Sequence, residues 1–110
     1  MLVSIIIPVY NEEKLIKNLL LILNSIKKIK KEIIVINDGS TDKTLKVLKK
    51  DCKNLFTKLL SYKKNRGKGF ACRKGINISN GEILIIQDGD LEYDPKNYYR
   101  LIKPIIKKKN

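Results

Sequence analysis

The stretch Ile83-Leu84-Ile85-Ile86-Gln87-Asp88-Gly89-Asp90-Leu91-Glu92 decides the fold class of this chain. Its first four residues are apolar, and an unbroken apolar run predicts a strand buried on both faces, as in a parallel sheet. The acids that follow would lie at the carboxyl end of that strand, where open α/β sheets bind their ligands. Clustered carboxylates repel one another unless a cation lies among them, and their oxygens suit Mg²⁺ or Mn²⁺. The stretch therefore predicts a metal-dependent site for a phosphorylated ligand.

Apolar β-branched runs and helical periods alternate along the rest of the chain. Strands are predicted at 2–9, 33–36 and 59–62, before the strand at 83–86. Helices are predicted from a cap at 11–13 to Ile26, after the turn 37–42, from the loop 63–69 to Ile76, and from Asp94-Pro95 onward, with Pro104 bending or ending the last one. This alternation indicates an α/β fold, with one domain over residues 1–110 and about four mostly parallel strands joined by right-handed crossovers.

Polar clusters follow the predicted strands. An Asp- and Asn-containing turn lies at 37–42, and a basic, glycine-rich loop lies at 65–69. Because parallel strands end at the same edge of a sheet, we expect these clusters to converge with Asp88 and Asp90. Each cluster also has a purely structural interpretation. Pro8 can simply end a strand, Asp38 can form a turn before a helix, and the glycine-rich loop can be an ordinary turn.

The chain carries a large positive charge. Its 24 Lys and Arg against 11 Asp and Glu give a net charge of +13, which favours an anionic partner such as nucleotide phosphates, an acidic membrane surface or nucleic acid. The absence of histidine excludes a Ser-His-Asp triad and His-ligated zinc within the chain. Two isolated cysteines indicate reduced thiols and a cytoplasmic location. No apolar run reaches the roughly 18 residues of a transmembrane helix.

Four motifs occur in a fixed order along the chain. They are SIIIPVYNEE at 4–13, NDGSTD at 37–42, NRGKG at 65–69 and QDGDLEYDP at 87–95. In order and spacing they resemble the motifs of glycosyltransferase family 2, and most closely those of its dolichol-phosphate mannosyltransferase-like branch. The resemblance covers the whole chain, and it implies the nucleotide-sugar-binding half of a GT-A domain, which is Rossmann-like.

The resemblance also implies roles for individual residues. At the nucleotide it places Pro8, Tyr10, Glu12, Ile36, Asp38, Asp88, Gly89 and Asp90; at the phosphate or sugar it places Arg66, Lys68 and Arg73; at the metal it places Asp88, Asp90 and Glu92. Glu92 stands where the branch commonly has glutamine, Gly89 where it has alanine, and Asn37 where an aspartate is often found. The carboxylate base that a hydroxyl acceptor needs lies, in the family, beyond residue 110, so no catalytic residue is expected within this chain.

The function implied by the resemblance is inverting, Mg²⁺- or Mn²⁺-dependent transfer of a sugar from a nucleotide sugar of the GDP-mannose or UDP-glucose type. The implied acceptor is a polyprenyl phosphate, with peripheral contact at the cytoplasmic face of a membrane. The family's acceptor-binding half would lie outside the chain, so self-association or a completing chain is a further expectation. Two alternatives remain, a nucleotide-binding remnant that does not transfer and a basic nucleic-acid-binding module. The second is disfavoured because aromatics form no stacking pattern.

Overall fold

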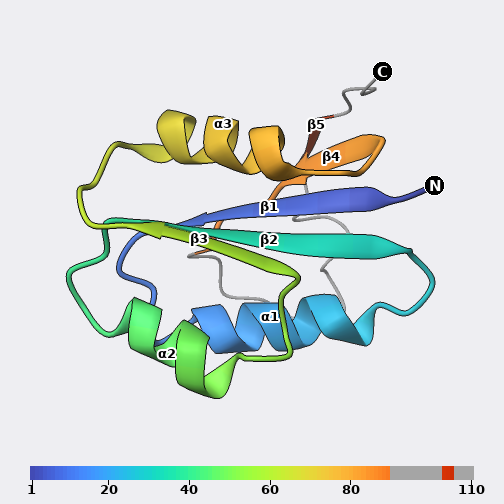
Figure 1. Cartoon of the computed structure of the whole chain (residues 1–110). Helices are drawn as coiled ribbons and strands as arrows, with labels where there is room; N and C mark the ends of the chain where they lie inside the picture. The colour runs from blue at the N-terminus through green and yellow to red at the C-terminus, as the bar shows by residue number, and fades with distance from the viewer. Residues whose placement is uncertain (90–102, 106–110) are drawn as a thin grey trace.

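The computed structural model describes residues 1–89 and 103–105, in which strands and helices alternate (Figure 1). The elements are β1 (Val3–Val9), α1 (Ile16–Ser25), β2 (Lys31–Asp38), α2 (Thr44–Asp51), β3 (Lys58–Tyr62), α3 (Lys68–Ile78), β4 (Ile83–Ile86) and β5 (Lys103–Ile105). The helices have 8 to 11 residues, and within the described ranges none is long and apolar enough to cross a membrane.

The strands form one sheet in the order β3-β2-β1-β4-β5. Strands β1 to β4 are parallel to one another, and β5 pairs antiparallel with β4. The chain leaves the central strand β1 toward β2 and β3, and later returns on the other side of β1 as β4. The change of direction makes the gap beyond β1 and β4 a topological switch point, the usual place for a ligand in such sheets. The predicted α/β fold with mostly parallel strands is confirmed.

Helices cover both faces of this sheet. Helices α1 and α2 lie on one face and α3 on the other (Figure 1). Successive β1 side chains therefore enter different cores: Ile5 and Ile7 pack with α1, whereas Ile6 packs beneath α3. Burial on both faces explains why the strand sequences are apolar without alternation.

The beginning of α1 differs from the prediction. A helix capped at 11–13 was expected, but α1 begins at Ile16, and Asn11 has a positive φ of 55°. The side-chain oxygen of Asn11 accepts hydrogen bonds from the backbone amides of Thr41 (2.8 Å) and Asp42 (3.2 Å). The prediction was wrong because Asn11 joins two loops, a tertiary contact that competes with helix capping.

The end of the chain also differs from the prediction. Residues 103–105 were expected within a helix that Pro104 bends or ends, but they form the short strand β5, in which Pro104 is paired with Ile85. Proline lacks the N–H that a helix interior needs, and it is tolerated at the edge of a sheet. The helix predicted to start at Asp94-Pro95 lies outside the described residues up to Ile102.

A buried carboxylate organises the amino ends of the strands. Glu32 is 5% exposed, and its Oε2 accepts hydrogen bonds from the Ser4 hydroxyl (2.5 Å) and from the backbone amides of Asn80 (2.5 Å) and Gly81 (3.2 Å). Lys58 Nζ lies 3.5 Å from Oε1. Burial acts to raise the pKa of Glu32, but these hydrogen bonds and the Lys58 charge outweigh it and leave the pKa below its ordinary value. The network ties β1, β2 and β3 to the turn before β4.

Candidate functional site

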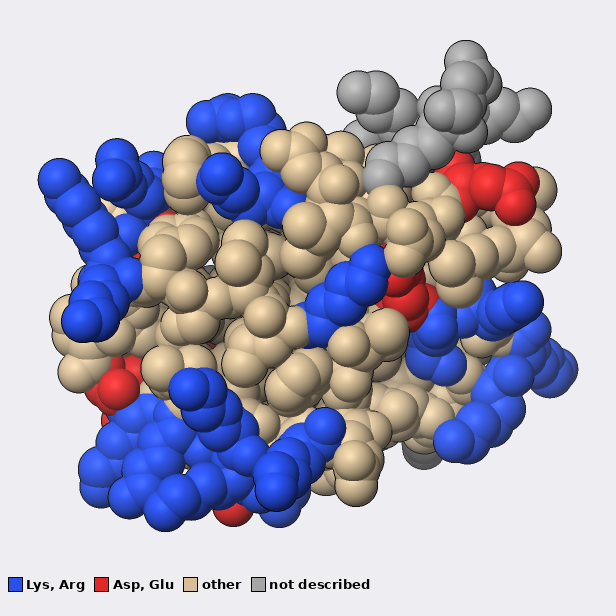
Figure 2. All heavy atoms as spheres, in the orientation of Figure 1, with Lys and Arg blue, Asp and Glu red and all other residues tan. Residues whose placement is uncertain are grey.

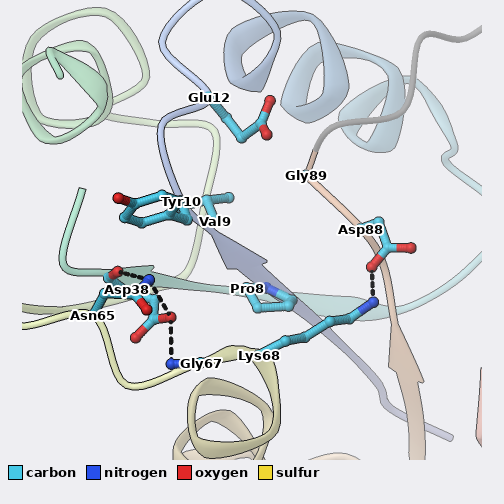
Figure 3. Close-up of a pocket in the computed structure, with 10 residues that line it drawn as sticks. All are labelled: Pro8, Val9, Tyr10, Glu12, Asp38, Asn65, Gly67, Lys68, Asp88 and Gly89. Carbon is cyan, nitrogen blue, oxygen red and sulfur yellow. Dashed lines mark hydrogen bonds and ion pairs between the residues drawn. The ribbon is translucent and has the colours of Figure 1, made fainter. Parts of the chain in front are cut away.

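A pocket of about 410 Å³ lies at the switch point, beyond the carboxyl ends of β1, β2 and β4 (Figure 3). We name it the edge pocket. It is lined by Pro8, Val9, Tyr10, Glu12, Asp38, Asn65, Gly67, Lys68, Asp88 and Gly89. The convergence expected from the sequence is therefore present, because these residues come from every one of the polar clusters that follow the strands.

The segment after β1 supplies the first wall. Pro8 is compatible with a central strand because β1 pairs with β4 only as far as Ile6, whose carbonyl accepts the Gln87 amide at 2.9 Å. Pro8 therefore lies where no ladder donor toward β4 is needed. Tyr10 is 45% exposed. Glu12 is placed by its backbone amide, which donates to Thr44 Oγ1 at 2.8 Å, so the start of α2 positions the carboxylate that lines the pocket.

Asp42 belongs to this support and does not line the pocket. Its Oδ1 accepts the backbone amide of Thr44, the first residue of α2, at 2.9 Å. Burial acts to raise the pKa of Asp42, but hydrogen bonds from the Thr44 hydroxyl and amide outweigh it and lower the pKa.

Asp38 holds the loop that forms the second wall. Its Oδ1 accepts the backbone amide of Arg66 at 2.8 Å, and its Oδ2 accepts the backbone amide of Gly67 at 3.0 Å and Nδ2 of Asn65 at 3.1 Å. Two carboxylate oxygens offer about four acceptor positions. Three of them are used by this loop, and the Tyr62 hydroxyl also lies beside this carboxylate.

Gly39 permits this arrangement. It has a φ of +66°, and a Cβ at this position would lie 2.3 Å from the backbone nitrogen of Asn65. A side chain here would be strained by the backbone conformation and would also collide with the loop. Gly39 and Asp38 together bring residues 64–67 against the end of β2. The turn expected at NDGSTD therefore also makes a tertiary contact with the loop at 64–67, which local turn chemistry does not predict.

Lys68 crosses the pocket to Asp88. The two residues come from opposite walls, Lys68 from the first turn of α3 and Asp88 from the segment after β4. Nζ of Lys68 forms an ion pair and hydrogen bond with Oδ1 of Asp88 (Figure 3). In the same view Asp38 and Asp88 lie at opposite ends of the pocket. The pocket therefore has an acceptor-rich end and an end with a carboxylate already facing a cation.

Gly89 lies close to the chain that follows β1. A Cβ at this position would lie 2.6 Å from Cγ1 of Val9 and 3.3 Å from the carbonyl oxygen of Pro8. A residue without a side chain allows a close approach to its backbone. In the structure it is the β1 segment that approaches, and the absence of a side chain keeps the two walls together.

Several predicted residues lie elsewhere. Ile36 is fully buried in the core beneath α3. The guanidinium of Arg66 lies over the ring of Phe70, with 5.8 Å from Cζ to the ring centroid, and Arg73 lines a different hollow beside Phe70 and Lys74. Asp90 and Glu92 fall outside the described residues. The nucleotide and phosphate roles assigned to the predicted residues stay predictions.

Three pocket residues were not singled out from the sequence. Asn65 and Gly67 belong to the NRGKG motif, so the motif itself was the available signal. Val9 belongs to the motif at 4–13, where it could be taken for one more apolar strand residue. The thiols are poor candidates for nucleophilic chemistry, since burial raises the pKa of both Cys52 and Cys72.

Asp88 is a suitable ligand for a divalent cation. The Asp88 side chain is 43% exposed at the pocket wall, and the Lys68 ammonium already lies beside its carboxylate. Oxygen donors of this kind suit Mg²⁺ and Mn²⁺. Within residues 1–89 and 103–105 there is no cluster of three or more acidic, histidine or cysteine side chains. The other predicted metal ligands, Asp90 and Glu92, lie beyond Gly89.

Comparisons with known proteins agree with this architecture. The sequence profile of glycosyl transferase family 2 matches residues 4–110. An uncharacterized glycosyltransferase of Synechocystis sp. is 42% identical over 105 residues, which cover 90% of this chain and 32% of the relative. The human dolichyl-phosphate beta-glucosyltransferase is 38% identical over 98 residues, covering 79% of this chain and 30% of the relative. This chain thus spans about a third of the length of these relatives.

A solved structure shows the same arrangement of elements. The mannosyltransferase PcManGT from Pyrobaculum calidifontis, in complex with GDP-Man and Mn²⁺, superposes with a TM-score of 0.74 at 26% identity, covering 90% of this chain and 30% of that one. The family profile spans nearly the entire chain, and its motifs line the edge pocket. The chain therefore belongs to glycosyl transferase family 2.

Proposed function

We propose that this chain is the nucleotide-sugar-binding part of a metal-dependent glycosyltransferase. It would bind a GDP- or UDP-linked sugar, and the complete enzyme would transfer that sugar by inverting displacement to an acceptor, for which we propose a polyprenyl phosphate. One observation carries the proposal: the edge pocket combines acceptors for a nucleoside, a cationic helix start and a carboxylate suited to a metal in one hollow at the switch point.

Each end of the pocket suits one part of such a donor. The Glu12 carboxylate can accept from both hydroxyls of a ribose. Asp38 lines the same end of the pocket as the exposed Tyr10 ring, where a base would lie (Figure 3). The start of α3 and the Lys68 ammonium suit a diphosphate. A Mg²⁺ or Mn²⁺ held by Asp88, with Asp90 and Glu92, would supply charge neutralisation for the departing diphosphate.

The acceptor proposal rests on chemistry and on the relatives. A polyprenyl phosphate is largely dianionic near neutral pH, since the second pKa of a phosphate monoester is about 6. Such an acceptor needs no base from the protein to attack the anomeric carbon. The human relative is named for a dolichyl-phosphate substrate. We propose a cytoplasmic location at a membrane surface on the same grounds, because that is where a polyprenyl phosphate would be met.

A titration of GDP- and UDP-sugars with and without Mn²⁺ tests the proposal. We expect saturable binding that Mn²⁺ strengthens, and that Asp88→Ala and Asp90→Ala abolish the metal effect. Asp51→Ala removes an exposed acid at the end of α2 and serves as the control. Binding without transfer to a polyprenyl phosphate would identify a non-catalytic nucleotide-binding chain. If no nucleotide binds but single-stranded DNA does, the proposal is wrong.

The nucleic-acid alternative has weaker support from the surface. Figure 2 shows Lys and Arg side chains of the described residues in several clusters around the edge of the face in view, separated by uncharged surface. Phe70, a partly buried aromatic, has Arg66 and Lys74 over its ring at 5.8 and 5.2 Å. These side chains compete with a base for that ring.

A further inference from the structure

The Lys68–Asp88 pair spans the place where the proposed metal and diphosphate would bind. The side chain of Lys68 is 60% exposed and that of Asp88 is 43% exposed. Ion pairs this exposed are weak, so solvent and competing ions readily replace one partner. The pair is therefore a contact in which a competing ion can replace one partner.

Lys68 and a divalent cation would compete for Asp88. The ammonium lies against Oδ1, so a cation bound at that oxygen would place two positive charges at contact distance, where they repel strongly. Lysine has a flexible four-carbon stem. Its backbone is secured by the neighbouring Gly67 amide, which donates to Asp38 at 3.0 Å. The ammonium can therefore leave Asp88 while the start of α3 stays in place.

A diphosphate would give the released ammonium a new partner. Lys68 is the first residue of α3, and the start of a helix favours anions through its dipole and its backbone amides. A diphosphate attracted to a cation at Asp88 would lie between that cation and the helix start, within the span that the Lys68 side chain already crosses (Figure 3).

We propose that Lys68 exchanges partners during donor binding: it neutralises Asp88 in the free chain and moves to the diphosphate when a divalent cation takes its place at Asp88. This inference rests on the proposed function, because it takes the diphosphate of a nucleotide sugar as the ligand. Without a diphosphate, Lys68 competes with the cation for Asp88. With a diphosphate present, Lys68 binds the diphosphate instead, so the cation and the diphosphate bind cooperatively. Lys68 is thus a binding residue that couples two sites.

Two binding measurements on the 110-residue chain test the exchange. Free Mn²⁺ is followed by electron paramagnetic resonance without nucleotide, and UDP and GDP binding is followed by calorimetry with and without Mn²⁺. Lys68→Gln should bind Mn²⁺ alone about two- to five-fold more tightly, the range expected for an exposed ion pair. It should bind the diphosphate without metal roughly five-fold or more weakly. The gain in Mn²⁺ affinity caused by nucleotide should shrink accordingly.

Lys74→Gln is the matched control, because it removes the same charge from α3 outside the edge pocket. Lys68→Arg keeps a cation at the position and should behave like the wild type. The inference is overturned if Lys68→Gln leaves Mn²⁺ affinity and cooperativity unchanged while nucleotides still bind, or if Lys74→Gln gives the same shifts. If wild-type chain binds Mn²⁺ but neither UDP nor GDP, the proposed function fails, and the diphosphate step fails with it. In that case a tighter Mn²⁺ site in Lys68→Gln still supports the competition at Asp88.

Discussion

Replacing Asp38 by asparagine separates a role in holding the 65–67 loop from a role in ligand binding. The carboxylate is 3% exposed and accepts hydrogen bonds from Arg66, Gly67 and Asn65 at 2.8 to 3.1 Å. Asparagine keeps one acceptor oxygen, so at least one of the three hydrogen bonds is lost, and those that remain no longer involve a charged acceptor. Hydrogen bonds to a charged group contribute roughly 1.5–3 kcal/mol each, against about 1 kcal/mol for neutral ones.

The expected cost of Asp38→Asn is therefore about 2–4 kcal/mol in the free energy of unfolding. For a chain of this size that corresponds to a fall in Tm of roughly 10 °C. Urea unfolding of the ligand-free chain gives the free energy, and hydrogen exchange reports whether the Arg66 and Gly67 amides lose protection. Asn65→Ala removes the Nδ2 hydrogen bonds to the carboxylate and to the backbone carbonyl of Asp38, both at 3.1 Å, and should cost roughly 1.5–3 kcal/mol.

Asp51→Asn, which changes an exposed aspartate on α2, is the control and should stay within about 0.5 kcal/mol of the wild type. The reasoning is refuted if Asp38→Asn unfolds with wild-type stability and its loop amides stay protected. A normal fold with weaker nucleotide binding would then assign Asp38 to the ligand alone.

Two further predictions concern the rest of the fold. Because the folded chain holds the pKa of Glu32 below its ordinary value of 4.5, the stability that Glu32 provides is complete above that pH and is lost as the pH falls through the lowered pKa. Glu32→Gln should cost roughly 1–3 kcal/mol at pH 7 and flatten the acid limb of the stability profile measured by urea unfolding, and an unchanged acid limb would contradict this. Gly75→Ala should destabilise by about 1–2 kcal/mol although alanine is the better helix former, because a Cβ there would lie 2.4 Å from Cγ2 of Ile6. Gly69→Ala in the same helix meets its nearest contact, Arg73, only at 3.6 Å, so it should be neutral or stabilising, and equal effects of the two variants in thermal unfolding would disprove the packing argument.

The fold was predictable where local pattern and burial agree. Runs such as 83–86 are apolar at every position because both faces of the sheet are covered, and this is visible without coordinates. The predictions failed where a tertiary contact outweighs local preference. Asn11 has the chemistry of a helix cap, but it bonds the loop after β2. Residues 103–105 were predicted from the sequence to lie within a helix, but they form a strand that pairs with β4.

The sequence by itself determined the family, the order of the strands along the chain and the clusters that meet at the carboxyl edge. Motif order and apolar periodicity are local properties of the sequence, so they can be recognised without knowing any tertiary contact. Only the tertiary structure decided what each side chain in the edge pocket touches. In the structure Asp38 accepts hydrogen bonds from the loop at 65–67, and Lys68 pairs with Asp88. Arg66 and Arg73 lie outside the pocket. These outcomes depend on distances between segments far apart in the chain, and sequence spacing does not contain those distances.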